Sequence, residues 1–299
     1  MSEKLKNLIR ADQLGRKTME NLFDLSRDIK TNPEKYRNAL AGKIVQLMFF
    51  EPSTRTRMSF HSAALQLGAG VISTENGNEN SSARKGETLE DTIMTLNGYG
   101  DAIVMRHSDD DSSERAARVA TVPIINAGAG KREHPTQALL DVFTVWERFG
   151  SLDGAKIAVL GDLKNGRTTH SLLKLLSNYN AVTVYGLSRK ELSMPEEFRG
   201  GVDYKICESF DDIPRDVNAL YHTRTQRERT DADFGQEPFI IDKKVMQRFS
   251  DDTLIMHPLP RNEEISTDVD NDPRAIYFKQ AHNGVLTRMA LLLTLLGDY

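Results

Sequence analysis

The sequence predicts an α/β protein made of two doubly wound parallel-sheet domains of similar build joined by helices. First, short β-branched runs alternate with longer amphipathic segments, which is typical of βαβ units. Second, a length of 299 residues favours two domains over one. Third, the segments KIVQLMFFEPSTRTRMS and KIAVLGDLKNGRTTHS both read as a strand, a polar loop and an Arg-Thr pair that opens a helix.

The expected elements alternate along the whole chain. Strands are expected at Ile44–Phe49, Ala102–Met105, Val122–Ile125, Ile157–Leu160, Val182–Tyr185, Asn218–Tyr221 and Leu254–Met256. Helices are expected at Met19–Ile29, Thr56–Leu67, Thr88–Tyr99, Pro135–Phe149, Thr168–Asn178 and Val285–Leu296. We expect a first domain over residues 1–134 and a second over residues 135–284, with the C-terminal helix, residues 285–299, packing back on the first.

Composition excludes several classes of protein. A formal net charge of -4 argues against a non-specific nucleic-acid binder, and the longest late apolar run, Met289–Leu296, is too short to cross a membrane. The N-terminal segment is charged and shows no secretory signal. The only cysteine, Cys207, cannot form an intrachain disulfide and is interpreted as a half-buried strand residue. We therefore expect a cytoplasmic protein, and no metal or cofactor motif is present.

Hydrogen-bond donors are most concentrated where the first strand meets a helix. Ser53, Thr54, Arg55 and Thr56 combine hydroxyl groups, a guanidinium and the positive end of a helix dipole. One hydroxyl would suffice to cap a helix, so this excess predicts a site for phosphate or another oxyanion. Arg57 cannot face the same ligand as Thr56 at helical spacing, and we expect it to serve as scaffold.

The segment Gly161–Thr168 nearly matches the nucleotide-binding P-loop, because it follows a strand and opens a helix. However, Arg167 stands where that motif has its lysine, and no hydrophobic run ending in a partner aspartate is apparent. A guanidinium favours bidentate recognition of carboxylates. We therefore reject ATP binding and interpret Arg167 as a carboxylate ligand, with a surface arginine at a helix start as the alternative.

Further polar residues follow other expected strands, where ligands of open α/β sheets bind. They are Arg106, Arg224 with Gln226, His134 with Gln137 before a helix, and the His257–Arg261 turn containing Leu259 and Pro260. Each has a structural alternative: His134 as a helix cap, and the proline-rich turn as a stiff connection. The repetition of arginines at strand ends in an acidic protein predicts small anionic ligands.

Seven stretches, in order along almost the whole chain, resemble the catalytic chains of aspartate carbamoyltransferases. These stretches are FFEPSTRTRMSF, KGETLEDT, DAIVMRH, HPTQALLD, GDLKNGRTTHSL, TRTQRER and HPLPRNEEISTDVD. STRTR is specific for carbamoyltransferases, whereas Pro258 in HPLPR resembles the aspartate enzymes rather than the ornithine enzymes. The resemblance implies transfer of a carbamoyl group from carbamoyl phosphate to L-aspartate in de novo pyrimidine biosynthesis.

The resemblance also implies a role for each cluster. Carbamoyl phosphate would be bound by Ser53, Thr54, Arg55, Thr56, Ser81, Arg106, His134 and Gln137. L-Aspartate would be bound by Lys85, Arg167, Arg224, Gln226, Leu259 and Pro260. Catalysis would depend on Arg55, Thr56, Lys85, Arg106 and His134. Ser81 and Lys85 would reach the site of a neighbouring subunit, so a homotrimer is expected, and regulatory chains are a further partner of some relatives.

Two departures from the family pattern and two rival functions remain at this point. Arg84 stands where the family usually has a lysine, and Asn165 stands where some relatives carry an aromatic residue. A carbamoyltransferase with another acceptor, such as ornithine, is the nearest rival. A non-catalytic protein that retains the fold is the other, and it is disfavoured because the phosphate cluster and Lys85 are both present.

Overall fold

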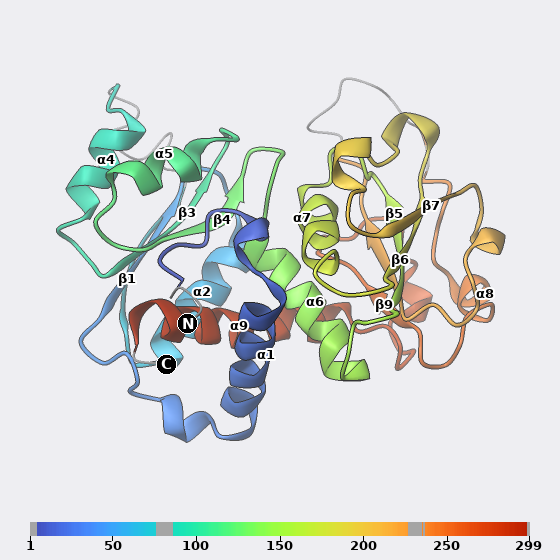
Figure 1. Cartoon of the computed structure of the whole chain (residues 1–299), viewed down its shortest axis with the longest axis horizontal. Helices are drawn as coiled ribbons and strands as arrows, with labels where there is room; N and C mark the ends of the chain where they lie inside the picture. Colours follow the sequence, from blue (N-terminus) through green and yellow to red (C-terminus); the bar gives the residue numbers. More distant parts are fainter. Residues whose placement is uncertain (1–4, 76–85, 227–234, 236, 298–299) are drawn as a thin grey trace. The chain divides into compact units, whose positions relative to one another are not determined.

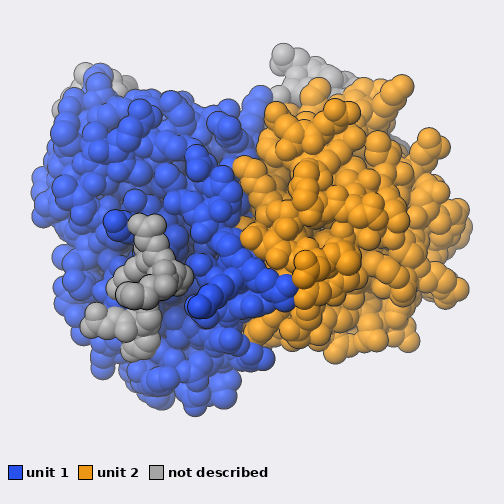
Figure 2. All heavy atoms as spheres, in the orientation of Figure 1, with its two compact units in different colours: residues 1–139, 283–299 blue, residues 140–282 orange. Residues whose placement is uncertain are grey.

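The computed structural model describes residues 5–75, 86–226, 235 and 237–297. The chain divides into two compact units, drawn in blue and orange in Figure 2. Unit 1 comprises Met1–Leu139 with Asn283–Tyr299, and unit 2 comprises Leu140–His282. The chain therefore passes from one unit to the other inside two helices, α6 (Pro135–Phe149) and α9 (Tyr277–Leu296).

Unit 1 is built on a parallel sheet with the strand order β2-β1-β3-β4. The strands are β1 (Ile44–Phe49), β2 (Gly70–Glu75), β3 (Ala102–His107) and β4 (Ile124–Ala129). The helices α4 (Leu89–Leu96) and α5 (Ser112–Val119) cover one face, where their apolar residues pack on Met48, Ile103 and Ile124. Figure 1 shows α1 (Arg16–Thr31), α2 (Thr54–Gln66) and the unit 1 part of α9 on the other side.

Unit 2 repeats this plan with the parallel strand order β7-β6-β5-β8-β9. The strands are β5 (Lys156–Gly161), β6 (Thr183–Leu187), β7 (Asp203–Cys207), β8 (Ala219–Thr223) and β9 (Leu254–Met256). One face of the sheet packs under α8 (Lys243–Met246) in a cluster that includes Leu160, Leu220 and Ile255. The helix α7 (Arg167–Leu176) follows β5, and its residues are mostly buried.

Short 3-10 helices punctuate the connections of both units. They span Ala11–Gln13 and Pro33–Tyr36 in unit 1, and Lys190–Leu192, Glu196–Phe198, Phe210–Asp212 and Thr267–Val269 in unit 2. Among the described residues, the structure contains no helix that combines the length and the apolar character needed to cross a bilayer.

The predicted fold class is confirmed, since both sheets are parallel and alternate with helices. The sequence did not reveal β2 or β7 as full strands. Both are edge strands whose side chains are largely exposed, so neither carries the apolar run by which a buried strand is recognised. The C-terminal helix begins at Tyr277, earlier than the expected Val285. The Asn283-Gly284 pair, whose residue types disfavour a helix interior, lies inside the helix.

Candidate active site

The Ser53–Arg57 cluster lies where β1 ends and α2 begins. Ser53 is the N-cap residue of α2, but its hydroxyl makes no capping hydrogen bond, and its backbone N–H donates to Glu75 Oε1 at 3.1 Å. Thr54 and Arg55 are exposed in the first turn of the helix, whereas Thr56 is buried. The hydroxyl of Ser53 is therefore not consumed by capping, and the first turn presents its donors at the positive end of the helix dipole.

Arg57 has a different environment from Arg55. Its guanidinium donates to Glu75 Oε2 at 2.9 Å and to Ser73 Oγ at 3.2 Å, and both partners lie on β2. These bonds tie the first turn of α2 to the neighbouring strand. The interpretation of Arg57 as scaffold is therefore confirmed.

Arg106 lies beside this cluster at the carboxyl end of β3. It is the register partner of Phe49, and its carbonyl oxygen accepts from the Phe50 N–H at 2.8 Å. Its Nε lies 3.5 Å from Glu51 Oε2 in the loop between β1 and α2. The parallel pairing thus brings Arg106 and the start of α2 to the same edge of the unit 1 sheet. Glu51 was not among the predicted site residues, although a carboxylate next to the donor-rich cluster was a visible signal in the sequence.

His134 precedes α6 in a loop that β4 and the N-terminal segment hold in place. Glu133 accepts from the Ala11 N–H at 2.7 Å, and the Ala129 N–H donates to the Glu133 carbonyl at 3.1 Å. His134 is buried at 4% exposure, and its Nδ1 lies 3.5 Å from Thr136 Oγ1. Gln137 is half-buried in the first turn of α6. The carboxyl end of β4 therefore delivers His134 and Gln137 to the same edge of the sheet as Arg106.

In unit 2, Arg167 is the first residue of α7 and is buried at 6% exposure. The loop before it packs tightly, because a Cβ on Gly161 would lie 1.9 Å from the Thr223 carbonyl oxygen and one on Gly166 would lie 2.6 Å from the Asp162 carbonyl oxygen. Gly161 also has a φ of +95°, a value that favours glycine. These two glycines of the P-loop-like pattern are thus explained by close backbone packing, which supports the rejection of a nucleotide-binding loop.

Asp162, which was not among the predicted site residues, organises the unit 2 cluster. Its Oδ1 accepts from the Asn165 N–H at 3.0 Å, and its Oδ2 accepts from the Gln226 N–H at 3.1 Å. The side-chain amide of Gln226 in turn donates to the Asn165 carbonyl at 2.8 Å. These bonds join the loop before Arg167 to the segment that contains Arg224, which follows β8. The structure therefore brings these two segments together at neighbouring strand ends.

The His257–Arg261 turn follows β9, and His257 is buried at its start. The Leu259 N–H donates to His257 Nδ1 at 2.8 Å, and His257 Nε2 lies 2.8 Å from Glu264 Oε1. Burial lowers the pKa of His257, while the hydrogen bond to Glu264 opposes that shift. Burial alone would raise the pKa of Glu264, but the bond from His257 and backbone N–H groups lower it to about 2. The pair is therefore a neutral imidazole that donates to a carboxylate.

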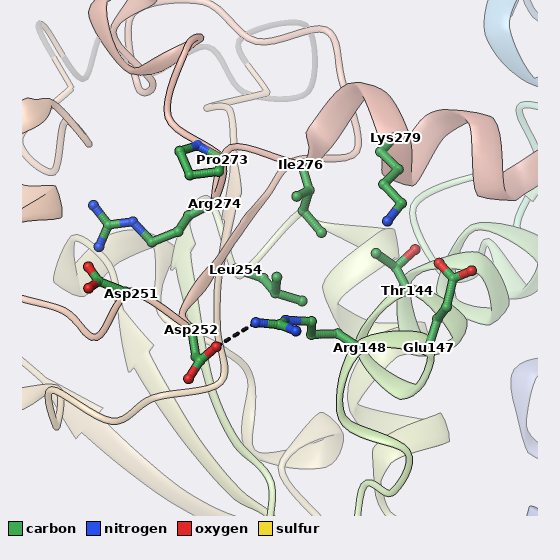
Figure 3. Close-up of a pocket in the computed structure, with 10 residues that line it drawn as sticks. All are labelled: Thr144, Glu147, Arg148, Asp251, Asp252, Leu254, Pro273, Arg274, Ile276 and Lys279. Atoms are coloured by element: carbon green, nitrogen blue, oxygen red, sulfur yellow. Dashed lines mark hydrogen bonds and ion pairs between the residues drawn. The ribbon is translucent and has the colours of Figure 1, made fainter.

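A cavity of about 490 Å³ lies elsewhere in unit 2, as Figure 3 shows. It includes Leu254, the first residue of β9, so it lies at the amino edge of the sheet, opposite the edge that bears Arg167. Both of its arginines are engaged within the protein: Arg148 pairs with Asp252, and Arg274 pairs with Asp272 and donates to three backbone carbonyls. We therefore do not assign the candidate site to this cavity.

Ser81 and Lys85 lie outside the described residues, as does the end of the TRTQRER stretch. Within the residues that are described, no three His, Cys, Asp or Glu side chains are grouped so that they could hold a metal ion. The candidate site is therefore made of guanidinium, hydroxyl, amide and imidazole groups.

Comparison with known proteins identifies the class to which this fold and site belong. Residues 6–147 match the carbamoyl-phosphate-binding domain of aspartate/ornithine carbamoyltransferases, and residues 153–295 match the Asp/Orn-binding domain. The chain belongs to the aspartate/ornithine carbamoyltransferase family and is a carbamoyltransferase.

Within that family, proteins similar to this chain include aspartate carbamoyltransferases. The chloroplastic enzyme of Arabidopsis thaliana is 43% identical, over 98% of this chain and 78% of the relative. The catalytic subunit from Clostridium perfringens is 42% identical, over 99% of both chains. A crystal structure of aspartate transcarbamoylase from Trypanosoma cruzi in complex with carbamoyl aspartate and phosphate superposes with a TM-score of 0.90 at 41% identity, covering 98% of this chain and 96% of that one.

Proposed function

We propose that this chain transfers the carbamoyl group of carbamoyl phosphate to the α-amine of L-aspartate, giving N-carbamoyl-L-aspartate and phosphate. L-Aspartate is proposed as the acceptor because hydrogen bonds in unit 2 link the two segments that contain its candidate arginines. Asp162, Asn165 and Gln226 tie the loop before Arg167 to the segment of Arg224. Two guanidinium groups on linked segments suit the two carboxylates of aspartate, whereas ornithine would call for acidic residues.

Unit 1 binds carbamoyl phosphate in this proposal. The backbone and hydroxyl groups of Ser53, Thr54 and Thr56, with the guanidinium of Arg55, hold the phosphate at the start of α2. This assignment is supported by the exposed first turn and by the Ser53 hydroxyl that makes no capping bond. Ser81, which lies outside the described residues, adds a hydroxyl from a neighbouring subunit.

The carbonyl oxygen of the carbamoyl group gains negative charge when the amine attacks. Arg106, His134 and Thr56 donate hydrogen bonds to that oxygen, and Gln137 holds the carbamoyl amide. A donor of this kind contributes on the order of 3 kcal/mol to transition-state stabilisation. Arg106 is oriented for this role by Glu51, whose carboxylate faces its Nε.

Unit 2 binds L-aspartate and positions the nucleophile. Arg167 and Arg224 hold the carboxylates with Gln226 beside them, and Lys85 from a neighbouring subunit adds a further charge. The carbonyl oxygens of Leu259 and Pro260 accept hydrogen bonds from the attacking amine and the carbamoyl NH2. The amine and the carbonyl then react directly without a covalent enzyme intermediate, because orientation alone can supply about 7–11 kcal/mol.

The active unit is proposed to be a homotrimer whose sites are shared between subunits. Exposed apolar side chains of unit 1 support this assembly: Met58 and Leu65 on α2 are 61% and 56% exposed, and Ile72 on the edge strand β2 is 45% exposed. Regulatory chains would be additional partners, and the reaction would serve pyrimidine biosynthesis. The cytoplasm is proposed as the compartment, because a single cysteine suits a reducing environment.

The decisive experiment is a carbamoyl-phosphate-dependent assay with L-aspartate and with L-ornithine, combined with a native mass measurement. Formation of N-carbamoyl-L-aspartate alone, by a particle of three chains, supports the proposal. Product from ornithine would instead establish the other acceptor class, and ligand binding without turnover would favour a non-catalytic protein. A mass above that of three chains would indicate further partners or a larger assembly.

A further inference from the structure

The turn after β9 holds Leu259 in an unusual backbone conformation. Leu259 has a φ of +55°, in the left-handed region that a branched side chain rarely adopts. A conformation of this kind persists only where the surrounding contacts determine it. The contacts of this turn therefore show what sets the direction of its peptide groups.

Two side chains bind the turn at both ends. His257 Nδ1 accepts the Leu259 N–H at 2.8 Å, so Nδ1 carries no proton and Nε2 carries one. Glu264 Oε1 accepts that Nε2–H at 2.8 Å and also accepts the Asn262 N–H at 3.0 Å. The side chains of His257 and Glu264 are 1% and 3% exposed, so water does not compete for these bonds. Glu264 thereby fixes the tautomer that can hold Leu259.

The same turn is anchored to the rest of unit 2 by a chain of buried hydrogen bonds. The His257 N–H donates to Gln280 Oε1 on α9 at 2.9 Å, and Gln280 Nε2 donates to Asp141 Oδ1 on α6 at 2.6 Å. Tyr221 on β8 donates its hydroxyl proton to Asp141 Oδ2 at 2.8 Å. These bonds fix the backbone of His257 relative to α6, α9 and β8. The orientation of the His257 ring then determines the orientation of the Leu259 N–H.

We propose that Glu264 is a positioning residue that acts through His257 to set the direction of the Leu259 and Pro260 carbonyl oxygens. This inference rests on the proposed function, in which those oxygens accept hydrogen bonds from the aspartate amine and the carbamoyl NH2. Glu264 and His257 touch neither substrate. They fix the two peptide groups that flank those carbonyls, Pro258–Leu259 through the Leu259 N–H and Arg261–Asn262 through the Asn262 N–H. A misplacement of about 1 Å at such a site can cost about 100-fold in rate.

The two bonds of His257 can be separated by substitution. The oxygen of an asparagine lies near the position of Nδ1, so His257→Asn keeps an acceptor for the Leu259 N–H. The amide nitrogen of a glutamine lies near the position of Nε2, so His257→Gln keeps a donor for Glu264 and loses that acceptor. We expect His257→Gln to lower kcat about 10- to 100-fold with little change in the affinity for inorganic phosphate. His257→Asn keeps that acceptor but loses the bond to Glu264, so it should lower kcat less than His257→Gln does.

Glu264 is tested by a double-mutant cycle with the isosteric change Glu264→Gln and the truncation Glu264→Ala. Glu264→Ala should lower kcat about 10-fold or more, and Glu264→Gln, which keeps an acceptor oxygen, should lower it less. In the His257→Asn background the same Glu264 substitutions should have a smaller effect, because the route through the imidazole is gone and only the bond to the Asn262 N–H remains. A purely structural role would lower the yield of folded protein without this dependence on the background.

The inference is overturned if both Glu264 variants and His257→Gln fold and turn over within two-fold of the unaltered chain. It is equally overturned if Glu264→Ala lowers kcat by the same factor in both backgrounds. Tryptophan fluorescence verifies folding, since the single tryptophan, Trp146, lies in unit 2. Absence of turnover by the unaltered chain with L-aspartate would refute the proposed function instead, and the two failures are therefore distinguishable.

Discussion

The two units share a fold but present their candidate ligands in different ways. In unit 1 the donors of Ser53–Arg55 lie in the first turn of α2, where Thr54 and Arg55 are exposed. In unit 2 the corresponding loop is fastened by Asp162, and Arg167 is buried. A phosphate can be recognised by one helix start with its dipole, whereas a dicarboxylate with an amine needs several segments in fixed relation. We therefore expect substitution of the exposed candidate ligand Arg55 in unit 1 to affect activity alone, and substitution of the buried candidate ligand Arg167 in unit 2 to affect activity and stability together.

The largest effect is expected for Arg55→Ala. Loss of the exposed guanidinium that is proposed to bind phosphate should lower kcat/KM for carbamoyl phosphate about 1,000-fold or more, with a far smaller effect on the melting temperature. Steady-state kinetics and thermal unfolding measure the two quantities.

Arg57→Ala is the matched control for Arg55→Ala, because it removes a neighbouring arginine that pairs with Glu75 rather than with a ligand. It should change stability by about 1 kcal/mol or less and leave turnover far less affected. Turnover of Arg55→Ala close to that of the unaltered chain would overturn the phosphate assignment.

Arg167→Ala should raise KM for L-aspartate about 100-fold and also destabilise unit 2 by about 1–3 kcal/mol, since the side chain is buried. Arg167→Lys keeps the charge but loses the planar fork, so it should recover stability more than it recovers aspartate affinity. Urea unfolding followed by Trp146 fluorescence and an aspartate titration give the two readouts. A variant with unchanged stability would remove the proposed contrast between the units.

The sequence predicted site residues that are adjacent along the chain better than residues that meet only after folding. The Ser53–Arg57 cluster was recognisable because its donors are adjacent in the sequence and exceed what a helix cap needs. Asp162 and Glu264 were not recognised, because their partners, Gln226 and His257, become neighbours only after the chain folds. The parallel sheets could be predicted because apolar strand runs alternate with amphipathic helical segments. The edge strands β2 and β7 bury too few side chains to show such an apolar run.

His134→Ala should lower kcat about 100-fold and leave the shape of the pH–rate profile unchanged. The reason is that a neutral imidazole which donates one hydrogen bond stabilises the carbonyl oxygen without exchanging a proton. The measurement is kcat and kcat/KM for the unaltered and variant chains across the pH range of activity. Disappearance of one ionisation in the variant would instead identify His134 as an acid or base.

The smallest effect concerns acid stability, which should be lost first in unit 2. The pKa of Glu264 is held at about 2, below its ordinary value of 4.5, so its contribution is complete above pH 4.5 and falls as the pH drops towards 2. The pKa of His257 is also lowered, so the unfolded chain takes up that proton first, and stability falls as the pH drops below 6.5.

Both shifts in unit 2 thus have the same sign, and Glu264→Gln should flatten the lower part of this pH dependence. Urea midpoints at pH 7, 5.5, 4 and 3, followed by Trp146 fluorescence, measure the stability of the unit that contains the pair. An equal slope for the variant and the unaltered chain below pH 4.5 would mean that Glu264 does not determine acid stability. Because Glu264 and His257 are almost fully buried while Arg55 is exposed, Arg55→Ala should leave the same pH dependence intact. The comparison therefore tests whether the proposed phosphate ligand Arg55 acts from the surface of unit 1, while the proposed aspartate site of unit 2 depends on the packing of that unit.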